Sequence, residues 1–228
     1  MIRFFAQPKY SITTVKLVGY ELFIREQATV GEDWRLPADF SQFKPQQIIH
    51  LLAETLKTFP QGLSCISFNL DQEQFVDLNY CRLLKTLQAQ TPIRLYVELT
   101  ERQGKGTAST TLQELVHAAQ AYQQAGLAVC LDDVGTGTNQ YELVRTMAAY
   151  TVEYKYALQN VRGRLPGDEI HTQIKFWREM ALRQQKTFAL EGFEYDTDNS
   201  LIAAFHPDIV QGYYFGQPHI LPIAADFN

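Results

Sequence analysis

The sequence has few cysteines and no excess of positive charge, and each shortage excludes a class of protein. Its three cysteines, Cys65, Cys81 and Cys130, are odd in number and widely spaced. They therefore predict reduced thiols in a cytoplasmic protein rather than a disulfide framework or a zinc site. The formal net charge is -5 at pH 7, whereas a surface that binds duplex nucleic acid carries clustered Lys and Arg. We therefore expect no duplex nucleic acid partner.

Long hydrophobic runs are also missing. A membrane-spanning helix needs about 20 apolar residues, and the longest apolar runs in this sequence are only as long as a β-strand. The N-terminal segment reaches Gln7 and Pro8 before it has formed the apolar stretch of a signal peptide. We therefore expect neither a membrane span nor a targeting segment.

Short β-type segments alternate with longer helical segments along the whole chain. The expected strands lie near residues 3–7, 15–25, 65–69, 94–98, 128–132, 153–156, 188–191 and 208–211. Helices are expected at about residues 45–57, 74–87, 112–125, 140–149, 168–184 and 198–205. Such alternation is typical of an α/β fold with parallel strands.

The number and order of these segments predict a (β/α)8 TIM-type barrel. Only the short segment 8–13 separates the first two strands, so we expect the barrel to begin with an antiparallel first strand. The chain has 228 residues, and barrels of roughly 200 to 250 residues commonly form one domain. Because no linker interrupts the alternation, we expect a single domain over residues 1–228.

Polar side chains stand at the strand ends, where barrels of this type place their chemistry. These residues are Asn69, Glu98, Asp132, Asp133, Glu191 and Gln211, with Lys155 inside its strand. Carboxylates on apolar strands cost free energy unless they are neutralised, and one divalent cation can neutralise several. Because the ligands would be oxygens, without Cys or His, the pattern favours Mg²⁺ or Mn²⁺ over zinc.

Each of these residues also has an ordinary explanation when it is taken alone. Glu98 is compatible with a helix cap, and Asn69 and Asp133 are compatible with turns after a strand. Lys155 could form a salt bridge with Glu153. Recurrence at successive strand ends favours one shared site over several unrelated caps and turns.

Several of these positions lie in short motifs that follow one another in a fixed order. Residues 20–25 read YELFIR, residues 98–101 read ELTE, and residues 131–137 read LDDVGTG. Residues 190–194 read LEGFE, and residues 211–215 read QGYYF. In this order the motifs resemble those of the bacterial EAL phosphodiesterase family over nearly the whole chain.

The resemblance implies an enzyme that hydrolyses the bacterial second messenger cyclic di-GMP to linear 5'-pGpG with two Mg²⁺ or Mn²⁺ ions. The implied ligands are Glu21, Asn69, Glu98 and Asp132 for one ion, and Asp132, Asp133 and Glu191 for the other. Such an assignment is chemically sensible. A phosphodiester is anionic, so attack by hydroxide requires cations that offset the repulsion and stabilise the leaving alkoxide.

The resemblance also implies roles for residues around the metal ions. Catalytic or supporting roles fall to Lys155, Glu191, Gln211 and Glu101. Lys155 would orient or activate the attacking water, and Glu101 would steady the loop that follows Asp133. Substrate contacts fall to Arg25 and Leu22. The loop after Asp133 would also carry a homodimer interface.

One position departs from the family pattern. Relatives carry Lys-Ile-Asp where this chain has Lys155-Tyr156-Ala157, so an acid on the side of the second metal ion is missing. A receptor that binds cyclic di-GMP without cutting it is therefore one alternative to the phosphodiesterase. An enolase-type barrel that uses Mg²⁺ is another, although it normally needs a capping domain for which this chain has no residues.

Overall fold

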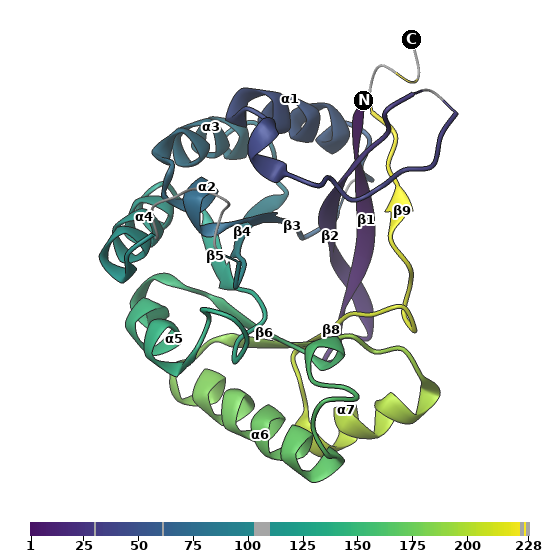
Figure 1. The fold of residues 1–228 in the computed structure, drawn as a ribbon, viewed down its shortest axis with the longest axis vertical. Coiled ribbons are helices and arrows are strands. Elements are labelled where there is room, and N and C mark those ends of the chain that lie inside the picture. Colours follow the sequence, from purple (N-terminus) through teal and green to yellow (C-terminus); the bar gives the residue numbers. More distant parts are fainter. Residues whose placement is uncertain (30, 61, 103–109, 224–225, 227–228) are drawn as a thin grey trace.

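The barrel sheet closes on itself (Figure 1). The computed structural model describes residues 1–228 except 30, 61, 103–109, 224–225 and 227–228. In this part of the chain the strand order is β2-β3-β4-β5-β6-β7-β8-β1-β9, and β1 also pairs with β2. Helices cover the outside of the ring (Figure 1). The predicted TIM-type α/β barrel is confirmed.

The strands run parallel except at β1. Their bounds are β1 Ile2–Ser11, β2 Lys16–Glu26, β3 Cys65–Leu70, β4 Arg94–Leu99, β5 Ala128–Leu131, β6 Glu153–Ala157, β7 Thr187–Glu191, β8 Ile209–Val210 and β9 His219–Ile220. From β2 to β8 neighbouring strands pair in parallel. β1 is antiparallel to both β2 and β8, as expected for the first strand.

The first strand is longer than the sequence indicated. We expected it to end at Gln7, but β1 continues through Pro8 as far as Ser11. A proline cannot donate to the ladder, so prolines inside a sheet occur beside irregularities. The pairing with β2 shifts register between Lys9 and Tyr10, one residue beyond Pro8. The strand thus continues past Pro8, and Lys9 belongs to the barrel wall.

The helices include one break that the sequence analysis missed. They are α1 Pro45–Leu56, α2 Gln72–Val76, α3 Leu78–Gln88, α4 Leu112–Gln124, α5 Tyr141–Met147, α6 Gly167–Arg183 and α7 Asn199–Phe205. The predicted helix over residues 74–87 is wrong as one element, because Asp77 separates α2 from α3. The Asp77 backbone is extended, and its side chain accepts a hydrogen bond of 3.0 Å from the Asn79 amide. Aspartate favours this capping position over a helix interior.

The last strand was also missed. β9 pairs with Phe5 and Ala6 of β1, whereas β8 pairs with Tyr10 and Ser11 at the other end of the same edge. Two short strands therefore share one side of β1. A two-residue strand is too short to show a period-two pattern.

Alternation along each strand separates the core from the barrel interior. In β4, Leu95, Val97 and Leu99 are fully buried and face the helices, so Glu98 between them faces inward. The same alternation in β2 and β6 turns Glu21 and Lys155 toward the interior, where they meet Glu98.

No helix in the described residues is long and apolar enough to cross a membrane.

Candidate active site at the barrel mouth

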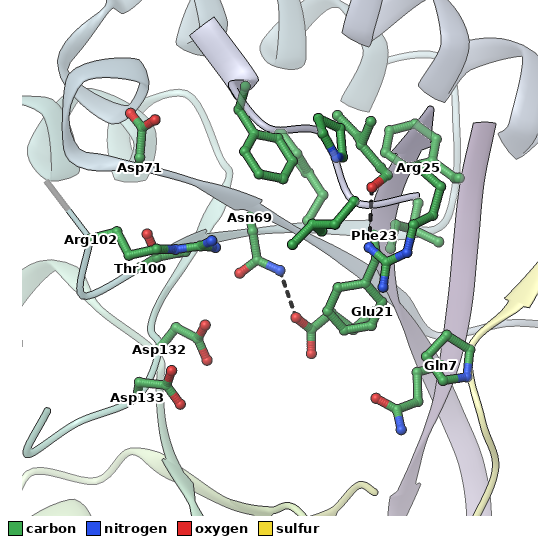
Figure 2. A pocket seen from close by; sticks show the side chains of 18 of the residues that line it. Gln7, Glu21, Phe23, Arg25, Asn69, Asp71, Thr100, Arg102, Asp132 and Asp133 are labelled. Carbon is green, nitrogen blue, oxygen red and sulfur yellow. Dashed lines mark hydrogen bonds between the residues drawn. The ribbon is translucent and has the colours of Figure 1, made fainter. Parts of the chain in front are cut away.

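A cavity of about 680 Å³ opens at the C-terminal ends of the parallel strands. The predicted site residues that line it are Glu21, Leu22, Arg25, Asn69, Asp132, Asp133, Glu191 and Gln211. Figure 2 shows Glu21 and Asn69 facing Asp132 and Asp133 across this space. The strands of the barrel therefore bring together residues that lie far apart in the sequence.

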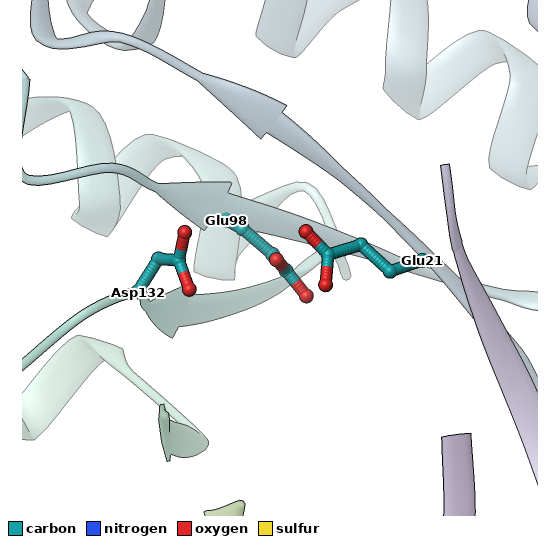
Figure 3. A group of neighbouring side chains, drawn as sticks. All are labelled: Glu21, Glu98 and Asp132. Atoms are coloured by element: carbon teal, nitrogen blue, oxygen red, sulfur yellow. The ribbon is translucent and has the colours of Figure 1, made fainter. Parts of the chain in front are cut away.

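Three carboxylates form a cluster at this mouth (Figure 3). Glu21, Glu98 and Asp132 each offer an oxygen, and these oxygens all lie within 4.8 Å of one another. The side chains come from β2, from β4 and from the residue directly after β5. All three residues are buried, so solvent does little to screen their mutual repulsion.

Lys155 supplies positive charge to these acids. Its Nζ lies 3.0 Å from oxygens of Glu21, Asp132 and Glu191 and 2.5 Å from Glu98 Oε2. Burial alone would lower the pKa of Lys155, but the four surrounding carboxylates outweigh it and raise the pKa well above its usual value. Lys155 is therefore a permanent cation in the middle of the site.

Two amide side chains complete the surroundings of Glu21. Asn69 Nδ2 donates to Glu21 Oε1 at 2.6 Å, and Gln211 Nε2 donates to Glu21 Oε2 at 2.8 Å. The remaining oxygens, Asn69 Oδ1 and Gln211 Oε1, are buried and accept no hydrogen bond from the described residues. Unpaired buried acceptors are costly, and a cation beside the carboxylates would satisfy them.

The pKa values show that the site is short of positive charge. Burial, with the negative charge of Glu98, raises the pKa of Glu21 to about 7. Burial also raises the pKa of Asp132 to about 7, against the attraction of Lys155. For Glu98 burial acts in the same direction, but the ammonium groups of Lys155 and Lys9 outweigh it and lower the pKa to about 2. An additional cation would therefore favour full ionisation of the cluster at neutral pH.

A second group of acids lies beside the first. Oxygens of Glu101, Asp132 and Asp133 are within 4.8 Å of one another. Burial and the charge of Glu101 raise the pKa of Asp133 to about 6. The backbone oxygen of Glu101 accepts a hydrogen bond of 2.8 Å from the Thr138 hydroxyl. Glu101 thus contacts the loop after Asp133 through its backbone, while its carboxylate faces the acids.

That loop needs a glycine where it meets Glu101. Gly137 has a φ of +46°, and a Cβ added there would lie 2.8 Å from the Glu101 backbone oxygen. A larger residue would therefore push the two segments apart.

The two predicted substrate contacts differ in character. The Arg25 guanidinium donates to its neighbour's backbone oxygen, Ile24 O, at 3.2 Å and lies 5.8 Å from the Phe23 ring centre. Within the described residues no carboxylate forms a salt bridge with Arg25, and Arg25 is one of the residues that line the cavity. Leu22 is only 1% exposed and belongs mainly to the core beside the cavity.

The position of the missing acid lies next to the cluster. Ala157 is buried and pairs with Glu191 across β6 and β7. A carboxylate at Ala157 would therefore stand beside Glu191 at the strand ends. On the same side of the site, a hydrogen bond from the Asn160 side chain lowers the pKa of Asp133 and so opposes the effect of burial.

Two charged residues of the site were missed by sequence reasoning. Lys9 Nζ lies 2.9 Å from Glu153 Oε1 and 3.3 Å from Glu98 Oε1. Glu153 was considered only as a partner for Lys155, whereas the structure pairs it with Lys9. The available signal was the period-two spacing of Gln7 and Lys9, two polar residues on one face of an apolar strand.

Comparison with known families decides what kind of barrel this is. The family model described as the EAL domain matches residues 2–218. The chain belongs to the EAL domain family. This confirms the resemblance seen in the motifs and rejects the enolase-type alternative. No curated protein matches the chain.

Solved EAL structures share the fold at low sequence identity. An EAL domain protein from Listeria monocytogenes is 20% identical, with a TM-score of 0.77, over 96% of this chain and 88% of that chain. A standalone EAL protein from Vibrio cholerae, described in its cyclic di-GMP-bound form, is 19% identical with a TM-score of 0.70. The match covers 96% of this chain and 92% of that chain.

A third structure belongs to a longer protein. YkuI from Bacillus subtilis, described as a complex with the substrate cyclic di-GMP and calcium, is 17% identical with a TM-score of 0.76. The match covers 97% of this EAL domain but only 57% of YkuI. This chain therefore spans little more than half the length of that relative.

Proposed function

We propose that this EAL domain hydrolyses cyclic di-GMP to linear 5'-pGpG with the help of Mg²⁺ or Mn²⁺. The observation that carries the proposal is the cluster of Glu21, Glu98 and Asp132, whose oxygens lie within 4.8 Å of one another at the mouth of a cavity. The descriptions of the Vibrio and Bacillus relatives support the choice of cyclic di-GMP as ligand.

The residues present fit a divalent cation. All of the donors are oxygens, which Mg²⁺ and Mn²⁺ prefer, and the buried acceptors Asn69 Oδ1 and Gln211 Oε1 have no partner in the described structure. The proposed ligands are Glu21, Asn69, Glu98 and Asp132 for one ion, and Asp132, Asp133 and Glu191 for a second. Bound cations would offset the charge of the phosphodiester. They would also lower the pKa of a water molecule, so that hydroxide is available to attack the phosphorus.

The surrounding side chains have proposed roles of their own. Lys155 holds the ligand carboxylates in place and would help to orient or activate the attacking water. Arg25 lines the cavity beside Leu22, and its guanidinium group would suit a phosphate bound there. Gln211 supports the same network by orienting Glu21. Glu101 joins the metal-binding acids to the loop after Asp133, which we propose as the homodimer interface.

Product analysis tests the proposal directly. Purified protein is incubated with cyclic di-GMP and either Mn²⁺ or Mg²⁺, and the nucleotides are separated by chromatography. The linear dinucleotide is the expected product. Intact cyclic di-GMP after long incubation with either metal ion would contradict the proposed reaction.

The receptor remains a second candidate because of one observation. Ala157 places a methyl group beside Glu191 where a carboxylate would add a ligand to the second metal ion. A receptor would bind cyclic di-GMP tightly in calorimetry and release no product. The first cluster argues against this outcome, because a site that only binds has no need for three buried carboxylates that converge on one point.

The Asp132→Asn substitution should weaken Mn²⁺ binding strongly. It keeps the shape of the side chain but removes the charge of the ligand that both proposed metal positions share. We expect affinity to fall by roughly tenfold or more in calorimetry. Glu142→Gln, which alters an exposed carboxylate on α5 that pairs with Arg145, is the matched control. Equal Mn²⁺ affinity in Asp132→Asn and in the wild type would refute this ligand assignment.

Arg25→Ala should weaken the binding of cyclic di-GMP without affecting Mn²⁺. A charge-assisted hydrogen bond is worth about 2 kcal/mol, which corresponds to roughly thirtyfold in the dissociation constant. Calorimetry in the presence of Ca²⁺ measures the dissociation constant of cyclic di-GMP without the need for turnover. Arg145→Ala, an exposed arginine on α5, serves as the control. If the dissociation constant stays the same in Arg25→Ala, then Arg25 does not contact the phosphate.

A further inference from the structure

Lys9 lies inside the barrel, one inward-facing position below the proposed metal site. Across the β1–β2 pair Gln7 is opposite Glu21, and Lys9 is opposite Gly19. Residues opposite each other in an antiparallel pair share a face, so Lys9 points inward like Glu21. The opposite position is itself restricted to glycine, because a Cβ at Gly19 would lie 2.2 Å from the Cys65 backbone oxygen.

The Lys9 ammonium group binds two carboxylates in the barrel interior. Nζ is 2.9 Å from Glu153 Oε1 and 3.3 Å from Glu98 Oε1. The three side chains are 2%, 5% and 0% exposed, respectively. A buried ammonium group is tolerated only with such partners. Glu153 is the nearer of the two partners and shares the charge of Lys9 with Glu98.

Glu98 is consequently held at both of its oxygens. Oε1 faces Lys9 from within the barrel, whereas Oε2 faces Lys155 at the mouth. Rotation of this carboxylate would break both charge-assisted contacts, which are stronger than contacts between neutral groups. Glu21, in contrast, receives hydrogen bonds from the neutral amides of Asn69 and Gln211 as well as from Lys155.

We propose that Lys9 is a positioning residue for Glu98: it holds Oε1 from inside the barrel, so that Glu98 presents only Oε2 to a divalent cation at the mouth. This inference rests on the proposed metal site and adds to it. Metal affinity then depends on a lysine that touches neither the cation nor the substrate. Glu153 has the secondary role of keeping Lys9 charged and in place.

A charge-balanced double variant tests this role. Lys9→Met combined with Glu153→Gln removes one positive and one negative charge, so the net charge of the interior is preserved while the contact with Glu98 is lost. We expect Mn²⁺ affinity of the metal-free protein to fall about tenfold in calorimetry, as is typical when a partner of a metal ligand is removed. The kcat at low Mn²⁺ should fall with it, whereas KM for cyclic di-GMP should stay the same.

Two further variants separate positioning from general damage. Lys9→Arg keeps a cationic donor beside Glu98 and should recover most of the affinity. Lys186→Met removes a lysine whose Nζ donates to the Thr151 backbone oxygen at the other end of the barrel, and it should bind Mn²⁺ like the wild type. A folded double variant with wild-type Mn²⁺ affinity would overturn the role of Lys9. A wild-type protein that binds no Mn²⁺ would overturn the proposed metal site itself.

A crystal structure of the Mn²⁺-loaded wild-type protein gives an answer that does not depend on any variant folding. The expected arrangement has Glu98 bound to the cation through Oε2 alone, with Lys9 still within hydrogen-bonding distance of Oε1. Coordination by both oxygens, with Lys9 displaced from Oε1, would overturn the inference.

Discussion

Replacing Glu21 with alanine is expected to abolish hydrolysis of cyclic di-GMP. The substitution removes a proposed metal ligand together with the acceptor that orients both Asn69 and Gln211. Loss of about 4 kcal/mol of transition-state stabilisation corresponds to roughly a thousandfold in rate. The measurement is product formation at saturating Mn²⁺, with Glu142→Gln as a control that alters a carboxylate outside the cavity lining.

Thermal stability shows whether a Glu21 variant is inactive because it has lost a metal ligand or because it no longer folds. Burial raises the pKa of Glu21 in the folded protein to about 7, above its usual value, so ionised Glu21 destabilises the metal-free fold at pH values above its unfolded pKa. The isosteric Glu21→Gln variant should therefore melt at pH 8 no lower than the wild type, although it is inactive. An active Glu21→Gln protein, or one inactive only because it unfolds, would contradict the proposed role.

Replacing Lys155 with methionine is expected to have the largest effect on stability. The ammonium group contacts Glu21, Glu98, Asp132 and Glu191, and its removal leaves these buried carboxylates facing one another. Removing one partner from a buried ion pair costs about 3 to 5 kcal/mol. Urea unfolding of the metal-free protein measures this loss.

Mn²⁺ should reverse part of that loss. A divalent cation that binds the same carboxylates stabilises the folded state in proportion to its affinity, so the deficit of Lys155→Met should shrink as Mn²⁺ is added. Lys186→Met, which removes a lysine remote from the site, should show neither the deficit nor the rescue. Wild-type stability of Lys155→Met without metal would show that the four acids are not held by this lysine.

The strand ends could be predicted from the sequence because their signals are local. Glu98 and Asp132 each stand at the end of a short apolar run, and parallel strands of a barrel bring such ends to one mouth. The order of the motifs then supported the family, which the match over residues 2–218 confirms. What these residues do in the reaction stays a prediction.

The contacts inside the barrel could not be predicted in the same way. Lys9 meets Glu153 and Glu98 across 144 and 89 residues of sequence, and which strands face each other across the interior depends on how far the barrel strands are staggered. The break at Asp77 has a different cause. A single capping aspartate interrupts a segment whose apolar spacing suits one continuous helix.

A metal titration of turnover tests the central claim most directly. Protein freed of metal with a chelator is incubated with cyclic di-GMP over a range of Mn²⁺ concentrations, and the linear dinucleotide is quantified by chromatography. We predict no product without metal and a rise to saturation as Mn²⁺ fills the site formed by Glu21, Glu98 and Asp132. Tight binding of cyclic di-GMP with no product at any Mn²⁺ or Mg²⁺ concentration would contradict the account and leave a receptor.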